Sequence, residues 1–177
     1  VPHMAGSILG TQVTRTEDPE LLLGRGSYVS NLPLKDPLHL AFVRSEYAHA
    51  RIVGIDTAEA ASAPGVVGVY TGADAETAGY MRAPSFLPPT GKGGMKARVP
   101  ARPCMAIGKV RFVGDPVAMV IAESHLAAQD ACDLIEVVYE DLPAVVDPEA
   151  ALQPGAPLLH DDVPSNTCYT WAIGAQD

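Results

Sequence analysis

The chain has 177 residues, of which 47% are hydrophobic and 19% are charged, so it can bury a core and is not a disordered chain. Its formal net charge of −9 repels phosphate backbones, which argues against nucleic acid as a partner. No apolar run approaches the roughly 18 residues that cross a bilayer, and no signal peptide is recognisable. Sixteen glycines and sixteen prolines are typical of a mixed α/β domain with many turns.

The three cysteines, Cys104, Cys132 and Cys168, are far apart and form no C-x-x-C pair. They fit neither a disulfide framework nor a zinc knuckle, so a reducing, cytoplasmic setting is expected. The first three residues resemble a cloning remnant before Met4. Residues 1–12 are therefore predicted to be this remnant and an N-terminal arm.

The first half of the chain predicts short helices and strands in alternation. Asp18 is expected to cap a short helix that starts at Pro19 and ends at Gly24. Residues 38–45 alternate apolar and polar side chains and predict a strand, and 50–56 predict a second one. Further elements are a short helix capped by Asp56, a strand over 65–72 and a brief helix over 73–79.

Residues 80–108 are rich in proline and glycine and predict an irregular segment, which would be functional, an interface or mobile. Order returns with a strand over 109–113 and a turn at Gly114-Asp115-Pro116. VAMVIA (117–122) is apolar on both faces, so it predicts a central strand. The rest predicts a helix capped by Ser124, a strand ended by Pro143 and a last helical turn over 148–152.

Motifs for chemistry are weak. The GKGG run (91–94) lacks the earlier glycine and the following Ser or Thr of a phosphate loop, so a flexible loop is expected. The histidines have no metal-ligand spacing, and adjacent acidic residues such as Glu140 and Asp141 would point to opposite faces of a strand. Cys104 is expected to be exposed, but a lone thiol is weak evidence for a nucleophile.

The stretch RSEYAHARI (44–52) joins the first two predicted strands. His49 is expected to donate a hydrogen bond that fixes this turn. Arg44 and Arg51 could pair with Glu46, with Asp56 or with a neighbouring domain. Ligand binding by these arginines is less favoured, because no glycine-rich anion-binding loop accompanies them.

Four stretches, taken together in order and spacing, resemble a known family. They are RTEDPELLLGRGSYV (15–29), VRSEYAHARIVGID (43–56) with PGVVGVYTGAD (64–74), KVRFVGDPVAMVIAES (109–124) and VVYEDLPAVVDPEAAL (137–152). They resemble the N-terminal α/β hammerhead domain of the molybdenum hydroxylase large subunit, the family of aldehyde oxidase, xanthine dehydrogenase and aerobic carbon monoxide dehydrogenase. At Ser30-Asn31-Leu32 the family more often has an acidic pair before the leucine.

The resemblance implies an α+β fold, the α/β hammerhead, with a mixed β-sheet and a few short helices. The hammerhead domain would span 13–152, and 153–177 would be a linker to a molybdopterin-binding domain. The parent enzyme would hydroxylate a small substrate, or oxidise carbon monoxide, at a molybdenum pterin cofactor. Iron–sulfur clusters and FAD on partner subunits or domains would carry the electrons away.

No position matches the family's pterin-binding or catalytic motifs, so no catalytic, cofactor-binding or metal residue is carried over. The chain would be a structural piece that is inactive alone, and its interdomain interface would include Arg44, His49, Arg51 and Asp115. The alternative is a free-standing module that binds a small ligand or a protein through the loop 80–108.

Overall fold

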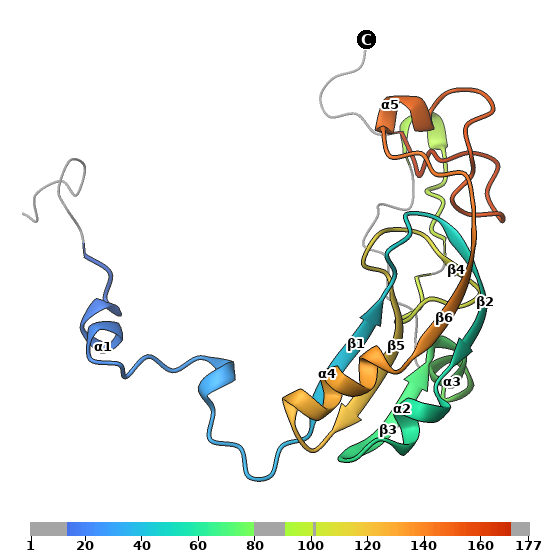
Figure 1. The fold of residues 1–177 in the computed structure, drawn as a ribbon. Coiled ribbons are helices and arrows are strands. Elements are labelled where there is room, and N and C mark those ends of the chain that lie inside the picture. Colours follow the sequence, from blue (N-terminus) through green and yellow to red (C-terminus); the bar gives the residue numbers. More distant parts are fainter. Residues whose placement is uncertain (1–13, 80–90, 101, 171–177) are drawn as a thin grey trace, which may run out of the picture. The chain divides into compact units, whose positions relative to one another are not determined.

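The computed structural model describes residues 14–79, 91–100 and 102–170 (Figure 1). The chain divides into two compact units, Val1–Pro37 and Leu38–Asp177, so the predicted domain 13–152 spans the boundary between them. The predicted arm 1–12 lies outside the described residues. So do 80–90 of the predicted irregular segment and 171–177 of the predicted linker.

The described part of the first unit contains one short helix, α1 (Asp18–Leu22), and a 3-10 turn, η1 (Val29–Asn31). The helix has proline in its first turn, as predicted, but its N-cap is Glu17 and no side chain bonds to the free amides. Gly24 follows it with a φ of 68°, the left-handed conformation that ends helices. None of residues 14–29 and 31–37 is buried, so these residues form no core of their own.

The second unit contains two three-stranded sheets in which every pairing is antiparallel. The predicted α+β hammerhead class is confirmed, with two antiparallel sheets where one mixed sheet was expected. Sheet A has the order β1 (His39–Arg44), β5 (Pro116–Ala122), β3 (Val66–Thr71). Sheet B has the order β4 (Lys109–Val110), β2 (Ala50–Asp56), β6 (Glu136–Asp141).

The short helices begin where polar side chains bind free backbone amides. Ser124 accepts from the Ala127 amide at the start of α4, as predicted. Thr71 and Asp74 form a capping box on α3. The helices of the second unit are α2 (Ala58–Ser62), α3 (Gly72–Thr77), α4 (His125–Asp133) and α5 (Pro148–Ala151), with a 3-10 turn, η2 (Lys92–Gly94).

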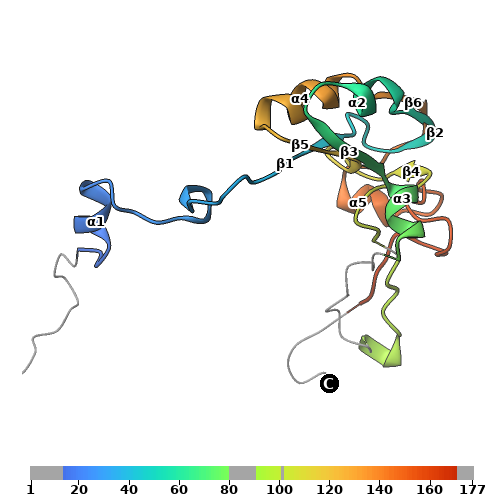
Figure 2. The same cartoon turned by 90° about the horizontal axis from the view of Figure 1, so that it is seen from below.

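The core lies on one face of sheet A. The inward residues Ala118 and Val120 of β5 are fully buried, and β5 is the central strand, as its apolar sequence predicted. Helices α2 and α4 lie together over this face at one end of the strands (Figures 1 and 2). Towards the other end, Val110 and Ala50 of sheet B pack with Val117 in a second cluster.

The opposite face of sheet A is apolar but open to solvent. Leu40 and Phe42 of β1 lie opposite Ile121 and Met119 of β5, and Tyr70 of β3 completes the row. The exposed fractions are 49% for Leu40, 38% for Phe42 and 41% for Tyr70. Exposed apolar patches of this kind are typical of surfaces that contact other protein. We call these five side chains the outer face of sheet A.

The chain passes from sheet A to sheet B at residues 45–49, so the predicted turn joins two sheets rather than two paired strands. Ser45 is buried and donates its amide to the Asp115 carbonyl, while Gly114 donates to the Ser45 carbonyl. Gly114 has a φ of 92°. The predicted strand over 109–113 is only two residues long, because the Arg111 amide bonds to the Asp115 carboxylate instead of a neighbouring strand.

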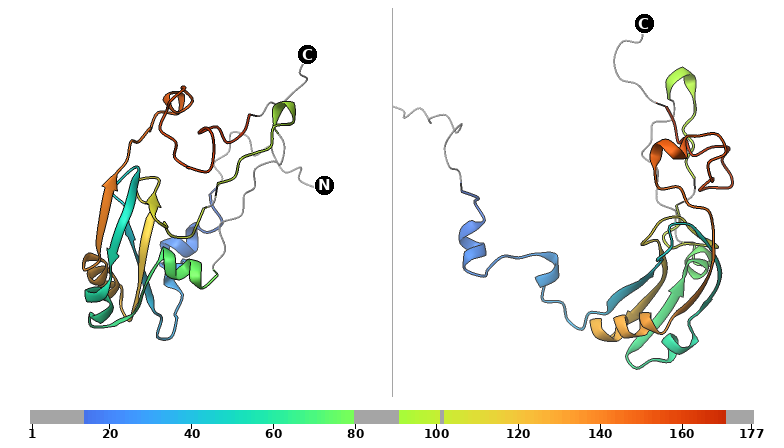
Figure 3. Two further views of the ribbon diagram at one scale, coloured as in Figure 1. Left: turned by 90° about the vertical axis from the view of Figure 1, so that its right-hand side faces the viewer. Right: turned by 45° about the horizontal axis from the view of Figure 1, so that its top comes forward.

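Residues 91–100 and 144–170 gather at the end of the strands away from α2 and α4 (Figure 3). The two segments are joined by backbone hydrogen bonds from Arg98 to Cys168 and from Lys92 to Thr170. No helix in the described part of the chain is long and apolar enough to cross a membrane.

Candidate functional site

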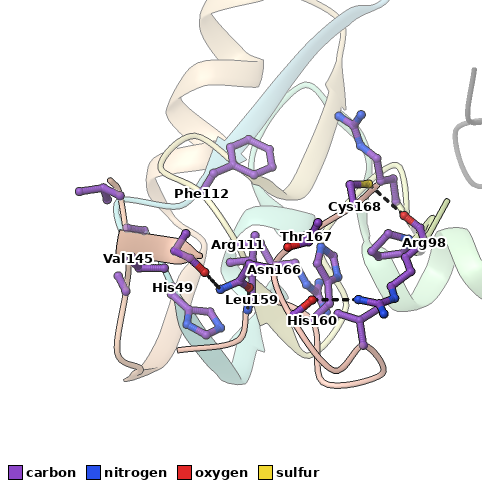
Figure 4. Close-up of a pocket in the computed structure, with 18 of the residues that line it drawn as sticks. His49, Arg98, Arg111, Phe112, Val145, Leu159, His160, Asn166, Thr167 and Cys168 are labelled. Carbon is purple, nitrogen blue, oxygen red and sulfur yellow. Dashed lines mark hydrogen bonds between the residues drawn. The ribbon is translucent and has the colours of Figure 1, made fainter. Parts of the chain in front are cut away.

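A pocket of about 890 Å³ lies at this end of the second unit (Figure 4). Its walls come from the sheet crossover (48–49), from 98–100, Arg102 and 111–113, and from parts of 144–151 and 159–168. Its volume falls within the range of small-molecule and peptide-side-chain pockets. Apolar side chains form much of the wall: Val99, Phe112, Val113, Val145, Val146, Leu159 and Val163.

His49 lines the pocket and is held there by the crossover. Its side chain is almost entirely buried, with 5% exposed, and its Nδ1 lies 2.7 Å from the Pro143 carbonyl oxygen. Because a carbonyl only accepts, Nδ1 must donate, and this is the hydrogen bond that the sequence predicted. Nε2 is buried and has no partner among the described residues.

Three arginines, Arg98, Arg102 and Arg111, also line the pocket. Arg98 donates to the Ser165 hydroxyl over 2.8 Å, and Arg111 donates to the Lys109 carbonyl over 3.3 Å. The Arg111 Nε is buried without a partner. In the described part of the chain, none of these guanidinium groups lies within ion-pair distance of a carboxylate. The three guanidinium groups therefore give the pocket wall positive charge, which the Asp115 carboxylate offsets in part at longer range.

Burial and these charges shift the pKa values of titratable groups around the pocket. Burial, followed by the Arg111 charge, lowers the pKa of His160, which favours its neutral imidazole. Lys109 is 9% exposed, and its ammonium group lies 2.7 Å from the Asp161 carboxylate. This bond lowers the pKa of Asp161. Burial raises the pKa of Asp115, and the Arg111 amide partly offsets that rise.

The four predicted interface residues do not form one cluster. Arg44 donates to the Gly114 carbonyl beside the outer face of sheet A, and its guanidinium lies 5.4 Å from the Phe42 ring centre. Arg51 pairs with Glu140 on β6 at 3.0 Å, whereas Glu46, Asp56 or a neighbouring domain were the predicted partners. Asp115 holds the crossover through its carbonyl and its carboxylate. Of the four, only His49 lines the pocket.

Sequence reasoning missed the pocket arginines and His160. They lie in irregular segments, whose path no hydrophobic periodicity predicts. One signal was readable: residues 96–111 contain five basic residues and no acidic residue. Cys104 is exposed, as expected. The described residues contain no group of three or more His, Cys, Asp or Glu side chains that could hold a metal ion.

The family model for the aldehyde oxidase and xanthine dehydrogenase α/β hammerhead domain matches residues 23–143. The chain belongs to this family. The hammerhead chain is 40% identical to the nicotine 6-hydroxylase large subunit of Paenarthrobacter nicotinovorans, an alignment that covers 93% of the chain and 19% of that protein. It is 37% identical to the carbon monoxide dehydrogenase large chain of Afipia carboxidovorans, covering 96% of the chain and 21% of that protein.

The fold is shared with solved structures of similar enzymes. The crystal structure of quinoline 2-oxidoreductase from Pseudomonas putida 86 superimposes with a TM-score of 0.76 and 44% identity, covering 90% of the hammerhead chain and 19% of that chain. A structure described as a Cu,Mo-containing carbon monoxide dehydrogenase gives a TM-score of 0.73 and 37% identity, with coverage of 94% and 19%. The hammerhead chain thus spans about a fifth of the length of its relatives.

Proposed function

We propose that this chain is the structural N-terminal domain of a molybdenum hydroxylase large subunit and that it packs against a molybdopterin-binding domain encoded outside residues 1–177. The observation that carries the proposal is the alignment of 93% of the chain with 19% of a hydroxylase large subunit. The described residues offer no ligand set for a metal, so we assign no catalytic step to them. Alone, the chain is expected to be inactive.

Two exposed apolar surfaces support a packing role. The first is the outer face of sheet A, with Arg44 at its margin. The second is the described part of the first unit, where Leu22 and Val29 are 87% and 86% exposed. Burying such side chains would stabilise an interface by about 1.5–3 kcal/mol each before the costs of ordering. We extend the proposed interdomain surface to include His49, Arg51 and Asp115.

The parent enzyme would supply the cofactors. A molybdenum pterin would carry out the oxidation on the neighbouring domain, and iron–sulfur clusters and FAD on partner subunits or domains would accept the electrons. Three observations accompany this proposal: the relatives are large subunits or chains of oxidoreductases, the three cysteines are free, and the net charge is −9. A cytoplasmic location and a lack of nucleic-acid partners are part of the same proposal.

The test compares two proteins, the 177-residue chain and the product of its full reading frame. Molybdenum is measured by mass spectrometry, and turnover is measured with nicotine, quinoline, hypoxanthine, aldehydes and carbon monoxide. We expect stoichiometric metal and turnover of at least one substrate only in the full product. Stoichiometric molybdenum or substantial turnover in the 177-residue chain would contradict this division of labour.

The second candidate function is a free-standing binding module. The pocket favours it, because residues 98–100 and Arg102 of the predicted loop 80–108 line the wall. A native stop codon after Asp177 and saturable binding of a small ligand by the chain would support this candidate. A reading frame that continues into a molybdopterin-binding domain would count against it.

A further inference from the structure

The charge of the pocket favours an anionic occupant. Among the described residues, three arginines and no acidic side chain line it: Arg98, Arg102 and Arg111. The whole chain is strongly acidic, so this local excess of positive charge is an exception within it. Guanidinium groups without a carboxylate partner attract anions and bind carboxylates with paired hydrogen bonds. Charge alone leaves the choice between a free anion and a protein carboxylate.

The hydrogen-bonding atoms of the wall favour a peptide. The His49 Nδ1 is bonded to the Pro143 carbonyl, and its Nε2 is buried without a partner among the described residues. The buried Arg111 Nε is a donor that lacks an acceptor. A buried polar atom without a partner costs about 1–3 kcal/mol. A peptide backbone can serve both atoms, because it presents both an N–H donor and a carbonyl acceptor.

Much of the remaining wall is apolar and includes Val99, Phe112, Val145 and Val163. Apolar walls around a few polar groups select a ligand with apolar parts next to its polar ones. The occupant should therefore carry a carboxylate flanked by apolar side chains. The relatives are about five times longer than this chain, so under the proposed function most of the polypeptide would lie outside residues 1–177.

We propose that the pocket receives a peptide segment from the same large subunit, outside residues 1–177, which carries a carboxylate flanked by apolar side chains. The inference rests on the proposed function, because it requires the longer polypeptide. Arg98 and Arg102 bind the carboxylate, and His49 and Arg111 bind the backbone of the segment. The pocket is thus the polar part of the interdomain interface, and the outer face of sheet A is an apolar part.

The first test is the Arg102→Gln variant, made in the full-length large subunit and in the 177-residue chain. Arg102 is exposed and has no hydrogen bond or ion pair within 4 Å among the described residues, and its charge acts on the Asp115 carboxylate only at longer range, so the variant should have a small effect in the short chain. Losing a hydrogen bond to a charged group costs about 1.5–3 kcal/mol, or about 10- to 150-fold. In the full-length subunit, amide hydrogen exchange across 98–113 and 159–168 should therefore accelerate by about that factor.

The matched control is Arg51→Gln. Arg51 has its partner, Glu140, within the chain, so its replacement should have the same small effect in both proteins. The second test uses the full-length Arg102→Lys variant, which keeps the charge and introduces an amine. A carbodiimide activates a nearby carboxylate, the amine displaces the resulting urea, and an amide cross-link remains. Peptide mass spectrometry should place that cross-link on an Asp or Glu outside residues 1–177.

Three outcomes would overturn the proposal. The first is unchanged amide exchange in the full-length Arg102→Gln variant, and the second is a cross-link confined to residues 1–177. The third is protection of the pocket amides in the full-length subunit only when benzoate is added, which would indicate a small-molecule site. If the wild-type full-length subunit holds molybdenum and turns over, these results refute the pocket assignment and leave the proposed function intact. If the reading frame ends at Asp177, both proposals fail.

Discussion

Replacing Gly72 tests the close contact between the start of α3 and the segment that precedes β4. Gly72 is the buried first residue of α3, and an added Cβ would overlap the Ala106 carbonyl oxygen. It would also lie 2.9 Å from the Ile107 Cγ1. Because the closest obstacle is backbone rather than a flexible side chain, the chain must shift. We therefore expect Gly72→Ala to destabilise the domain.

The magnitude follows from two opposing effects. Overpacking against backbone costs about 3 kcal/mol, the upper end of its usual range. Alanine also lowers the conformational entropy of the unfolded chain, which stabilises the folded state by about 0.7 kcal/mol. The net loss of about 2 kcal/mol corresponds to a decrease in Tm of about 8 °C for a domain of this size, at about 4 °C per kcal/mol.

The assay is thermal and urea unfolding of the 177-residue chain, followed by circular dichroism. The control is Gly54→Ala in β2, where an added Cβ would meet nothing within 4 Å and φ is ordinary. Its stability should stay within about 0.5 kcal/mol of the wild-type value. Equal stability of the two variants would refute the close contact between α3 and residues 106–107.

Three other predictions concern a cap, a turn and an ion pair. Ser124→Ala removes the N-cap bond of α4 and should lower the free energy of unfolding by about 1 kcal/mol; an unchanged urea midpoint would contradict the cap. Gly114→Val forces a β-branched residue to a φ of 92°, which should cost at least about 1–2 kcal/mol, and an unchanged Tm would remove that argument. The pKa of Asp161 is lowered in the folded state, so its contribution is present above the unfolded pKa and is lost as the pH falls through the folded pKa. The Tm difference between wild type and Asp161→Asn should accordingly narrow below about pH 4, and a constant difference would refute the Lys109 pairing.

Local chemistry allowed the sequence to predict most of the elements. The Ser124 cap, the central position of β5 and the strand over 66–71 all follow from capping and periodicity over a few residues. Two features depended on distant partners. The Arg51–Glu140 pair results from the register of β2 with β6, and the short β4 results from the Asp115 carboxylate.

The face assignment of β1 shows a further limit. The alternation of Leu40 and Phe42 predicted a strand correctly, yet these larger residues lie on the exposed face and Ala41 and Val43 on the inner one. Periodicity shows which residues of a strand share a face. It does not show which face packs on the core when the opposite face is also apolar and contacts another protein surface. The pocket could not be predicted either, because its arginines lie in segments without a repeating pattern.

The crossover at residues 45–49 also affects how the protein is made. It places β1 and β2, which are adjacent in sequence, in different sheets, and each waits for a partner from the second half of the second unit. Arg51 and Glu140 lie 89 positions apart, so a ribosome adding ~5–20 residues per second needs about 4–18 s between them. During that interval the nascent chain presents unpaired strand edges and apolar side chains. Synthesis of this domain therefore includes a window in which chaperones, rather than its own sheets, must protect it from aggregation.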